Sequence, residues 1–530
     1  MDTSLGTANR QIARAAGLVM VAFALNNIVG LARQVIMLNA FGTSGEMDAF
    51  IAANRVSETI FTLVAGGALA SAFIPTFTSL LVNDENRGAW KLASAIANLI
   101  LLVLTLIAAL AAIFAPLIVR YLLAPGFAAD QAQEQLTVDL MRLMLPSAVL
   151  FGLSGLVIGI LNSKQIFFLP ALAPTMYQLG MIFGVLVLAP RLGIFGLAWG
   201  VLIGSAGYLV IQLPSLLRIG GEYFPILGLK LPAVREVGRL MVPRLIGLAF
   251  VQLNFWINIR LATSISSGSA TGVYIGFTLM LMPQVLIAQS IAIAALPTFS
   301  AQFTQNKLQD MRASLASSVR SVLLLSLPAA VGLIILRIPL VELVYQRGEF
   351  TAESTQLVAW ALLWYALGLV GHSVVEIMVR AFYAMHDTKT PVLIGITAMS
   401  LNILFSFLFV ALFDRLDWMP HGGLALANSL ATMLEMGALL FIMRNRLQGL
   451  EGRRILIVFA KAALAVLIMA FVLVIWINQA INQPTWLLVI VGISVGAGVY
   501  GITILILGVE EARNLLNSAV HLVRQKIGAI

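Results

Sequence analysis

The chain has 530 residues, of which 60% are hydrophobic and only 10% are charged, and it carries a formal net charge of +9 without any cysteine. Soluble domains usually carry about 25% charged residues, so this composition excludes a cytosolic enzyme and a nucleic-acid-binding module. The lack of cysteine excludes disulfides, thiolate catalysis and cysteine-ligated metal centres.

Apolar segments follow one another along the whole chain, and each is long enough for a bilayer core that needs about 20 apolar residues per helix. Because lipid cannot satisfy an open strand edge, every segment is predicted to be a helix, which makes the fold class an all-α polytopic membrane protein. The first segment is too long for a cleavable signal. Fourteen transmembrane helices are predicted, near residues 12–40, 47–82, 92–120, 136–162, 165–189, 193–217, 240–262, 271–304, 313–336, 354–384, 391–413, 422–443, 455–478 and 485–508. An amphipathic tail over 510–530 is expected on the inner membrane surface.

Positive charge is distributed unevenly between the two sides of this predicted arrangement. The loops and helix ends on the side of the N-terminus hold 22 lysines and arginines, and those on the opposite side hold five. Cytoplasmic loops are enriched in lysine and arginine, so both termini are predicted to be cytoplasmic. Most of the net charge is thereby explained by topology and by contact with anionic membrane lipids.

Three short segments recur in order about 222 residues later. Residues 70–77 resemble 292–299, the segment at 159–170 resembles 380–391, and Gly196-Leu197-Ala198 resembles Gly423-Leu424-Ala425. The offset spans six predicted helices, which indicates a duplicated six-helix lobe with both copies in the same orientation, the plan of a parallel-repeat transporter. The predicted domains are residues 1–222 (helices 1–6), 223–447 (helices 7–12) and 448–530 (helices 13 and 14 with the tail).

No pattern of residues indicates catalysis. The four histidines are scattered, and HExxH, Walker A and GxSxG motifs are absent from the sequence. The chain is therefore predicted not to be an enzyme, with no catalytic residues, no cofactor and no metal site. Work done by such a chain would draw on an ion gradient, the membrane potential or the substrate gradient, and the sequence does not identify a coupling ion.

Polar residues gather on the first two predicted helices. At a rise of 1.5 Å per residue, Arg33 and Arg55 both lie roughly 10–12 Å below the outer membrane surface. Asn26 shares the face of Arg33, and Glu58 shares the face of Arg55. Two cations at equal depth suit an anion such as a pyrophosphate. The alternative is an internal ion-pair network with Glu58 that serves only packing.

Other residues allow local interpretations. Arg260 lies near a helix end and can extend to the interface, whereas Asp139 with Arg142 and Glu376 with Arg380 are spaced as pairs on one helix face. Glycines spaced by four residues predict close helix packing, namely Gly196, Gly200, Gly204, Gly492 and Gly496. Gly66 and Gly67, in the middle of the second helix, indicate a point of bending.

Several segments of the chain resemble the MurJ/MviN family of lipid II flippases. They are Gly30-Leu31-Ala32-Arg33 and Ala72-Phe73-Ile74-Pro75, together with residues 41–42, 48–50, 124–127, 159–162, 170–174, 346–351 and 382–391. The resemblance covers the first twelve predicted helices in order. It implies the fold of the multidrug/oligosaccharidyl-lipid/polysaccharide (MOP) flippase superfamily, with two six-helix lobes around a cationic cavity and helices 13 and 14 forming a groove for the polyprenyl tail.

The resemblance also implies roles for particular residues. Arg33 and Arg55 match basic positions of the family, and Asp48 matches an aspartate near the outer gate. The chain departs from the family at Asn27, Phe61 and Thr278, where basic residues are expected, and at Gly66, where an acidic one is expected. The cationic cluster is therefore reduced, and Arg260 is a candidate replacement.

The function predicted from these observations is movement of a polyprenyl-pyrophosphate-linked peptidoglycan precursor, lipid II, across the bacterial cytoplasmic (inner) membrane by alternating access. The predicted substrate-binding residues are Arg33, Arg55, Asn26, Glu58 and Arg260, and the predicted gating residues are Asp48, Gly66 and Gly67. The expected partners are a lipid-linked saccharide, membrane lipids and cell-wall synthesis proteins, without nucleic acid. Two alternatives stay open: a flippase for another lipid-linked glycan or a small-molecule exporter, and a non-transporting membrane scaffold.

Overall fold

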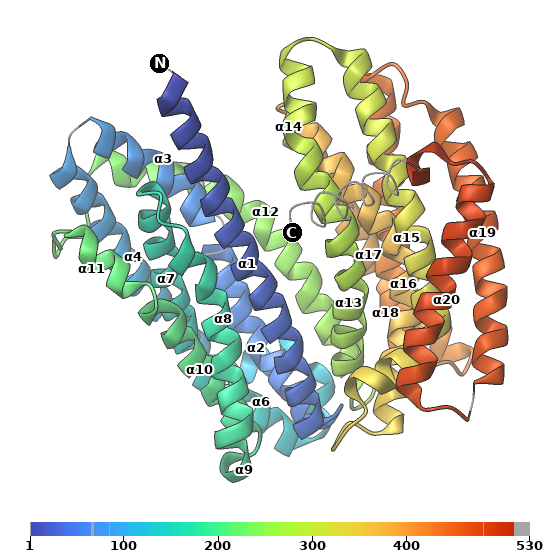
Figure 1. Cartoon of the computed structure of the whole chain (residues 1–530). Helices are drawn as coiled ribbons and strands as arrows, with labels where there is room; N and C mark the ends of the chain where they lie inside the picture. The colour runs from blue at the N-terminus through green and yellow to red at the C-terminus, as the bar shows by residue number, and fades with distance from the viewer. Residues whose placement is uncertain (1, 65–67, 84, 481, 514–530) are drawn as a thin grey trace, which may run out of the picture. The chain divides into compact units, whose positions relative to one another are not determined.

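A computed structural model describes the chain except for residues 1, 65–67, 84, 481 and 514–530. The described chain is helical and folds into two compact units (Figure 1). The first unit comprises Met1–Ala270 with Arg347–Phe350, and the second comprises Thr271–Gln346 with Thr351–Ile530. The domain limits at 222 and 447 were predicted from the sequence repeat. The two units are defined by contacts within the folded chain and so do not test these limits, which stay predictions.

The first unit is a bundle in which α8 packs against both α1 and α10, and α2 packs against α6 (Figure 1). Its long helices are α1 (Asp2–Phe41), α2 (Gly45–Val64), α3 (Ala68–Val82), α4 (Asn86–Ile113), α6 (Gln131–Met144), α7 (Pro146–Ser163), α8 (Phe168–Phe183), α10 (Ile194–Val210) and α12 (Pro232–Thr263). Shorter helical pieces join them, namely α5 (Ala115–Leu117), η1 (Ile118–Leu123), η2 (Pro125–Ala129), η3 (Gly184–Leu188), α9 (Ala189–Leu192) and α11 (Leu213–Ile219).

The second unit consists mainly of longer helices, and a buried apolar cluster joins α14, α15, α16 and α18. Its elements are α13 (Ser269–Gln284, whose first two residues belong to the first unit), the π-helix η4 (Val285–Gln289), α14 (Ser290–Thr304), α15 (Leu308–Tyr345), α16 (Ala352–Ala384), α17 (Lys389–Arg415), α18 (His421–Arg446), α19 (Gly452–Gln479) and α20 (Thr485–Ile506). A second apolar cluster joins α15 to α19 and α20.

The prediction of an all-α polytopic membrane protein is confirmed. Among the described residues, twelve helices are long and apolar enough to cross a bilayer. Large apolar side chains point outward along them, for example Leu102 and Leu106 of α4, as expected for a lipid-facing surface. The two predicted segments outside this set, 47–82 and 240–262, are those that carry Arg55, Glu58 and Arg260. The count of fourteen spans therefore stays a prediction.

One backbone feature occurs in both copies of the repeat that the sequence suggested. After α7, Gln165 has a φ of +60°, and after α16, His386, 221 positions later, has a φ of +58°. In both loops the next amide closes the turn onto a carbonyl five residues earlier, Ile166 onto Leu161 at 2.9 Å and Asp387 onto Phe382 at 3.0 Å. The same ending also follows α14, α17 and α18, at Asn306, Asp417 and Gln448, so it is a common way of ending these helices and the duplication stays a prediction.

Glycines let α8 and α10 approach closely, as their spacing predicted. A Cβ added to Gly180 would lie 2.2 Å from the Cα of Gly204, and one added to Gly184, the first residue of η3 directly after α8, would lie 2.7 Å from the Cα of Gly200. The two backbones are therefore in direct contact, the geometry that small residues allow between membrane helices. This contact sets the separation of two helices that line the cavity described below.

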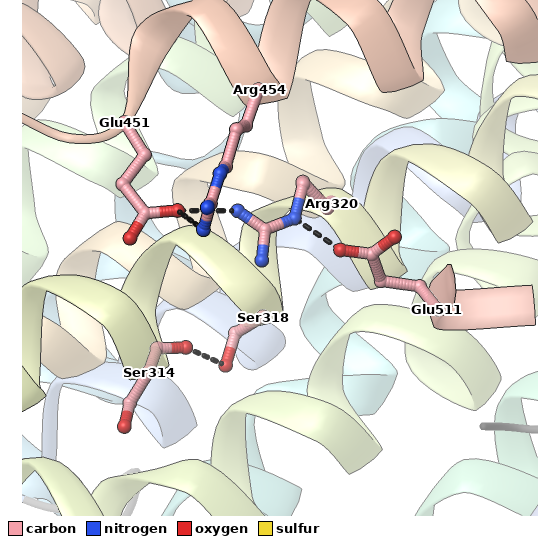
Figure 2. A network of polar contacts seen from close by, with 6 residues as sticks. All are labelled: Ser314, Ser318, Arg320, Glu451, Arg454 and Glu511. Atoms are coloured by element: carbon pink, nitrogen blue, oxygen red, sulfur yellow. Dashed lines mark hydrogen bonds and ion pairs between the residues drawn. The ribbon is translucent and has the colours of Figure 1, made fainter. Parts of the chain in front are cut away.

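An ion network ties three parts of the second unit together, and Figure 2 shows it from close by. The guanidinium of Arg320 on α15 contacts the carboxylate of Glu451, which precedes α19, at 3.0 Å, and also pairs with Glu511, which follows α20. Arg454 approaches the same Glu451 oxygen at 3.5 Å. Most of the predicted tail beyond this network lies outside the described residues.

Candidate functional site

The first unit contains a cavity of about 350 Å³ within its helical bundle. Four helices contribute its lining: α2 supplies one wall, and α7, α8 and α10 supply the others. The lining residues are Asn54, Arg55, Ser57, Glu58, Phe61, Thr62, Phe151, Pro174, Tyr177, Gln178 and Tyr208. In a membrane protein, a cavity with ionisable groups in its wall is a functional-site candidate, because such groups are costly in lipid.

An ion pair lies in the α2 wall of this cavity. The Nη1 of Arg55 lies 3.0 Å from Oε2 of Glu58, one helical turn later. The other carboxylate oxygen of Glu58 accepts a hydrogen bond of 2.9 Å from the amide of Asn54. The guanidinium of Arg55 also lies 4.9 Å from the ring centroid of Phe255 on α12, a cation–π distance. Arg55 is thus held by a carboxylate and by an aromatic ring.

A second set of contacts fixes α2 against α12. The hydroxyl of Thr59 donates to the carbonyl of Arg55 at 2.7 Å and accepts from the indole of Trp256 at 2.7 Å. The same hydroxyl lies 3.3 Å from the side-chain oxygen of Gln252. Because Thr59 is one residue beyond Glu58, these bonds hold the polar face of α2 in a defined orientation.

Several polar atoms in the cavity wall lack a hydrogen-bond partner within the described part of the chain. They are Oδ1 of Asn54, Nε of Arg55, Oγ of Ser57 and Oε1 of Gln178. Asn54 is 8% exposed and Ser57 is 1% exposed, so water reaches neither freely. A buried polar atom without a partner costs about 1–3 kcal/mol, and these four atoms are covered by the surrounding protein.

Four aromatic rings pack together in the wall of the cavity. The ring centroids of Phe61 and Phe151 are 4.6 Å apart, and Phe151 contacts Tyr177 at 5.2 Å and Tyr208 at 5.5 Å, both edge to face. These rings come from α2, α7, α8 and α10, so each wall contributes one. Phe61, at a position where the family resemblance leads one to expect a cation, is part of this aromatic surface.

Arg33 and Asn26 of α1 lie outside the lining of the cavity. The Nη1 of Arg33 is 3.8 Å from the sulfur of Met181 on α8, one turn beyond the lining residue Gln178. Nε of Arg33 and Oδ1 of Asn26 are buried and have no hydrogen-bond partner within the described ranges. The structure therefore brings Arg55 and Glu58 together in the cavity wall and places Arg33 against the adjacent helix α8.

The other predicted site residues lie elsewhere in the first unit. Arg260 donates a hydrogen bond to the backbone carbonyl of Tyr121 in η1. Asp48, in the first turn of α2, is fully buried, and its Oδ2 accepts a hydrogen bond of 2.7 Å from the amide of Gly268. Gly66 and Gly67 lie outside the described residues. Within the described ranges, no three His, Cys, Asp or Glu side chains gather as a metal site would require.

Several lining residues were not predicted from the sequence. Asn54 lies one turn before Glu58, and this spacing could have identified it. Gln178 and Tyr208 carried no local signal, because the packing of α10 against both α8 and α2 brings together residues that are far apart in the chain.

Comparisons with known proteins assign the fold to a family. The family model described as "Lipid II flippase MurJ" matches residues 37–495. The chain belongs to the MurJ family. The Burkholderia cenocepacia protein named "Lipid II flippase MurJ" is 30% identical over 431 residues, which cover 80% of this chain and 82% of that protein. A "Probable lipid II flippase MurJ" from Vibrio cholerae is 28% identical over 526 residues, 95% of this chain and 98% of its own.

Solved structures agree with the MurJ assignment. The structure titled "Lipid II flippase MurJ, inward closed conformation" superimposes with a TM-score of 0.79 at 25% identity, covering 94% of this chain and 99% of that one. An inward-facing multidrug resistance MATE transporter of the MOP superfamily gives a TM-score of 0.68 at 15% identity over 81% of this chain and 96% of that one, which shows a shared fold. This MurJ-family chain is thus a multi-pass membrane transporter and not an enzyme.

Proposed function

We propose that this chain moves lipid II from the inner to the outer leaflet of the bacterial cytoplasmic membrane by alternating access. Membership of the MurJ family over residues 37–495 carries the proposal. The cavity of the first unit supports it, because ionisable side chains are costly in lipid and belong in an interior or a cavity, and Arg55 and Glu58 line this one.

Within this proposal, Arg33 and Arg55 bind the pyrophosphate of the substrate. Arg55 lines the cavity, Arg33 lies against the adjacent helix α8, and a guanidinium carries five N–H donors that suit phosphate oxygens. Asn26 lies on the same helix face as Arg33 and adds a polar contact to the pyrophosphate. Glu58 pairs with Arg55 and so competes with the pyrophosphate for its guanidinium. Arg260 stays a predicted contributor, although its guanidinium donates to the Tyr121 carbonyl.

Asp48, Gly66 and Gly67 are proposed to act in gating. Asp48 joins the start of α2 to Gly268, just before α13, through a buried hydrogen bond, so its release or retention changes how firmly that end of α2 is held. The glycine pair would permit bending of the second predicted span, since glycine lacks the side chain that restricts backbone rotation.

The proposed topology has fourteen spans in two six-helix lobes related by the repeat, with α19 and α20 as two additional helices that form a groove for the polyprenyl tail. The unequal distribution of lysine and arginine supports cytoplasmic termini. Cell-wall synthesis proteins stay predicted partners.

The proposal is tested by expressing the chain in bacteria depleted of their own lipid II flippase. We expect the parent to restore growth, Arg33→Ala to fail at equal membrane expression, and Arg142→Ala to succeed. Arg142 is the matched control because it is an arginine paired with Asp139 at 3.9 Å and lies outside the cavity lining. A well-expressed parent that fails to restore growth refutes lipid II transport.

A second candidate function is movement of a different lipid-linked glycan. Arg55 is the only cation among the described lining residues, and Phe61 lies in the aromatic wall. A cavity with a single cation favours a lipid-linked glycan whose headgroup carries less negative charge than the headgroup of lipid II. Failure of the parent to restore growth, combined with binding of another polyprenyl-linked saccharide by the purified protein, would support this alternative.

A further inference from the structure

The segment that joins α11 to α12, residues 220–231, lies along α4 and is held there by two polar side chains of that helix. The amide of Asn98 donates hydrogen bonds to the carbonyls of Phe224 at 3.3 Å and of Ile226 at 2.9 Å. The hydroxyl of Ser94 accepts a hydrogen bond of 3.1 Å from the backbone N–H of Phe224. The segment therefore has a fixed place on α4, although it forms no regular secondary structure.

Two cations of α4 converge on the aromatic ring that this segment contributes. The guanidinium carbon of Arg87 lies 5.8 Å from the ring centroid of Phe224, and the ammonium of Lys91 also lies 5.8 Å from it. Both are cation–π distances. Because Arg87 and Lys91 are four residues apart on one helix, they share a face, and the ring directs both charges to one place.

The two cations have no acidic partner within the described ranges. Neither Arg87 nor Lys91 forms an ion pair there, whereas Arg320 and Arg446 of the second unit both do. Like charges four residues apart on a helix repel each other. An anion between them removes this repulsion, and phosphate oxygens accept strong hydrogen bonds from both a guanidinium and an ammonium.

Large apolar side chains close to these cations in the chain are exposed. Val82, five residues before Arg87, is 78% exposed, and Tyr223 and Leu227, on either side of Phe224, are 67% and 42% exposed. Apolar and aromatic side chains of this kind enter the lipid headgroup region at a membrane surface. Both connections, from α3 to α4 and from α11 to α12, lie on the side predicted to be cytoplasmic, so the anion within reach is a headgroup of the inner leaflet.

Beyond Asn98, the face of α4 that binds the segment becomes a lipid-facing surface. Leu102 and Leu106 lie 11 and 15 residues after Lys91, which places them on the same helix face, and both are more than half exposed. Acyl chains therefore find an apolar surface within a few turns of the two cations. A free phosphate makes no use of that surface.

We propose that Arg87, Lys91 and the ring of Phe224 form a binding site for the phosphodiester of an acidic phospholipid in the inner leaflet. The two cations contact the phosphate, and the exposed apolar side chains contact the chains. An acidic lipid is preferred over a zwitterionic one, because the positive group of a zwitterionic headgroup faces two cations. The site goes beyond the proposed function, since its ligand is a resident membrane lipid and its residues lie outside the lining of the first unit's cavity.

The test measures lipid binding to the purified full-length protein in detergent by native mass spectrometry, which counts the lipids retained. The two probes are phosphatidylglycerol, which has a net negative charge, and phosphatidylcholine, which has the same phosphodiester without a net charge. Arg87→Gln and Lys91→Gln each remove one cation of the site. Lys230→Gln is the matched control, because Lys230 is exposed on the same segment but is not one of the two cations at the Phe224 ring.

We expect the parent to bind phosphatidylglycerol more tightly than phosphatidylcholine. Arg87→Gln and Lys91→Gln should each weaken phosphatidylglycerol binding about fivefold, the usual contribution of one basic side chain at an acidic membrane surface, and leave phosphatidylcholine binding unchanged. Lys230→Gln should change neither affinity. Equal weakening by Lys230→Gln shows attraction by diffuse charge and overturns the site. Unchanged binding by both Arg87→Gln and Lys91→Gln, or equal affinity of the parent for the two lipids, also overturns it.

Free phosphate is the other source of the same chemistry, and competition separates the two. Inorganic phosphate should displace phosphatidylglycerol no more than chloride does at the same ionic strength. Stronger displacement by phosphate that is lost in Arg87→Gln assigns the site to a soluble phosphate and overturns the lipid assignment. Arg87→Gln and Lys91→Gln should unfold at the temperature of the parent, because neither side chain is buried. Restoration of growth by the parent does not depend on these outcomes, so their failure leaves the proposed function in place.

Discussion

The guanidinium of Arg55 and the carboxylate of Glu58 form an ion pair of 3.0 Å in the wall of the first unit's cavity, where 13% and 34% of their side chains are exposed. The sequence suggested two interpretations of these residues, an anion-binding site and an internal ion pair that serves only packing, and this pair has features of each. It is an internal ion pair, and it also lines a cavity in which Arg55 keeps one donor, its Nε, without a partner in the described chain. Its two halves can be separated by mutation.

We predict that Glu58→Gln strengthens binding of undecaprenyl pyrophosphate by up to about fivefold, because partly exposed ion pairs contribute only about 0–1 kcal/mol. The substitution removes the negative charge that competes for Arg55 and keeps an oxygen for Asn54, whose amide donates to Glu58 at 2.9 Å. The control is Asp139→Asn, which breaks the equally spaced pair with Arg142 outside the cavity. Weaker binding by Glu58→Gln would instead indicate that the ion pair holds Arg55 in the orientation that binds the pyrophosphate.

We predict that Gly204→Ala lowers stability by about 1–3 kcal/mol, the usual cost of adding a methyl group where there is no space. Its Cβ would lie 2.7 Å from the carbonyl oxygen of Tyr177, which cannot move without α8. Gly207 is the control on the same helix, because a Cβ there would be 3.6 Å from Met176, an ordinary contact. Thermal unfolding in detergent measures both variants. A Gly204→Ala protein as stable as Gly207→Ala would contradict the close approach of α8 and α10.

Local rules predicted much of the fold and some of its contacts. An apolar chain in lipid must form helices, and the spacing of Gly200 and Gly204 predicted a tight helix contact that the structure contains. The pair of Glu376 with Arg380, four residues apart, has a distance of 2.9 Å in the structure. The ion pair depends on the spacing of two residues along one helix, and the helix contact depends on the small size of glycine. Both can therefore be read from the sequence.

The composition of the cavity could not be predicted in the same way. Gln178 and Tyr208 face the same space as Asn54 because α8 and α10 pack against one another in a particular rotation, which neighbouring residues do not specify. The sequence predicted that Arg33 and Arg55 lie at equal depth in the membrane. Depth alone does not determine the direction in which each side chain points from its helix. Arg33 contacts Met181, whereas Arg55 lines the cavity.

We predict that the stabilising effect of Asp387 depends on pH. Burial raises the pKa of Asp387, but hydrogen bonds from Thr390 and the charge of Arg446 outweigh it, so the pKa lies below its usual value. A lowered folded-state pKa stabilises the protein above the unfolded value of about 3.9 and loses this effect as the pH falls through the folded-state value. The melting-temperature difference between the parent and Asp387→Asn should therefore be constant from about pH 7 to about pH 5 and decrease below about pH 4.

Arg446→Ala provides the control for this pH dependence. Arg446 contacts Asp387 at 2.5 Å, while the amides of Lys389 and Thr390 donate to Asp387 at 3.0 Å in either case. The same Asp387→Asn substitution is therefore made in the Arg446→Ala background, where its effect on the melting temperature should vary less with pH. An unchanged pH profile would mean that the charge of Arg446 does not set the pKa of Asp387.

We predict that Arg320→Ala destabilises the second unit by about 3–5 kcal/mol, because it leaves two largely buried carboxylates without their shared cation. Arg320 is 11% exposed, and its partners Glu451 and Glu511 are 20% and 12% exposed (Figure 2). Arg320→Lys should recover only part of the loss, since an ammonium lacks the planar geometry that contacts two carboxylates from separate nitrogens. Arg454→Ala is the control: its side chain is 75% exposed and pairs with Glu451 at 3.5 Å, so it should change stability by less than about 1 kcal/mol. If thermal unfolding places Arg320→Ala level with Arg454→Ala, the network does not hold α15 to the segments around α19 and α20.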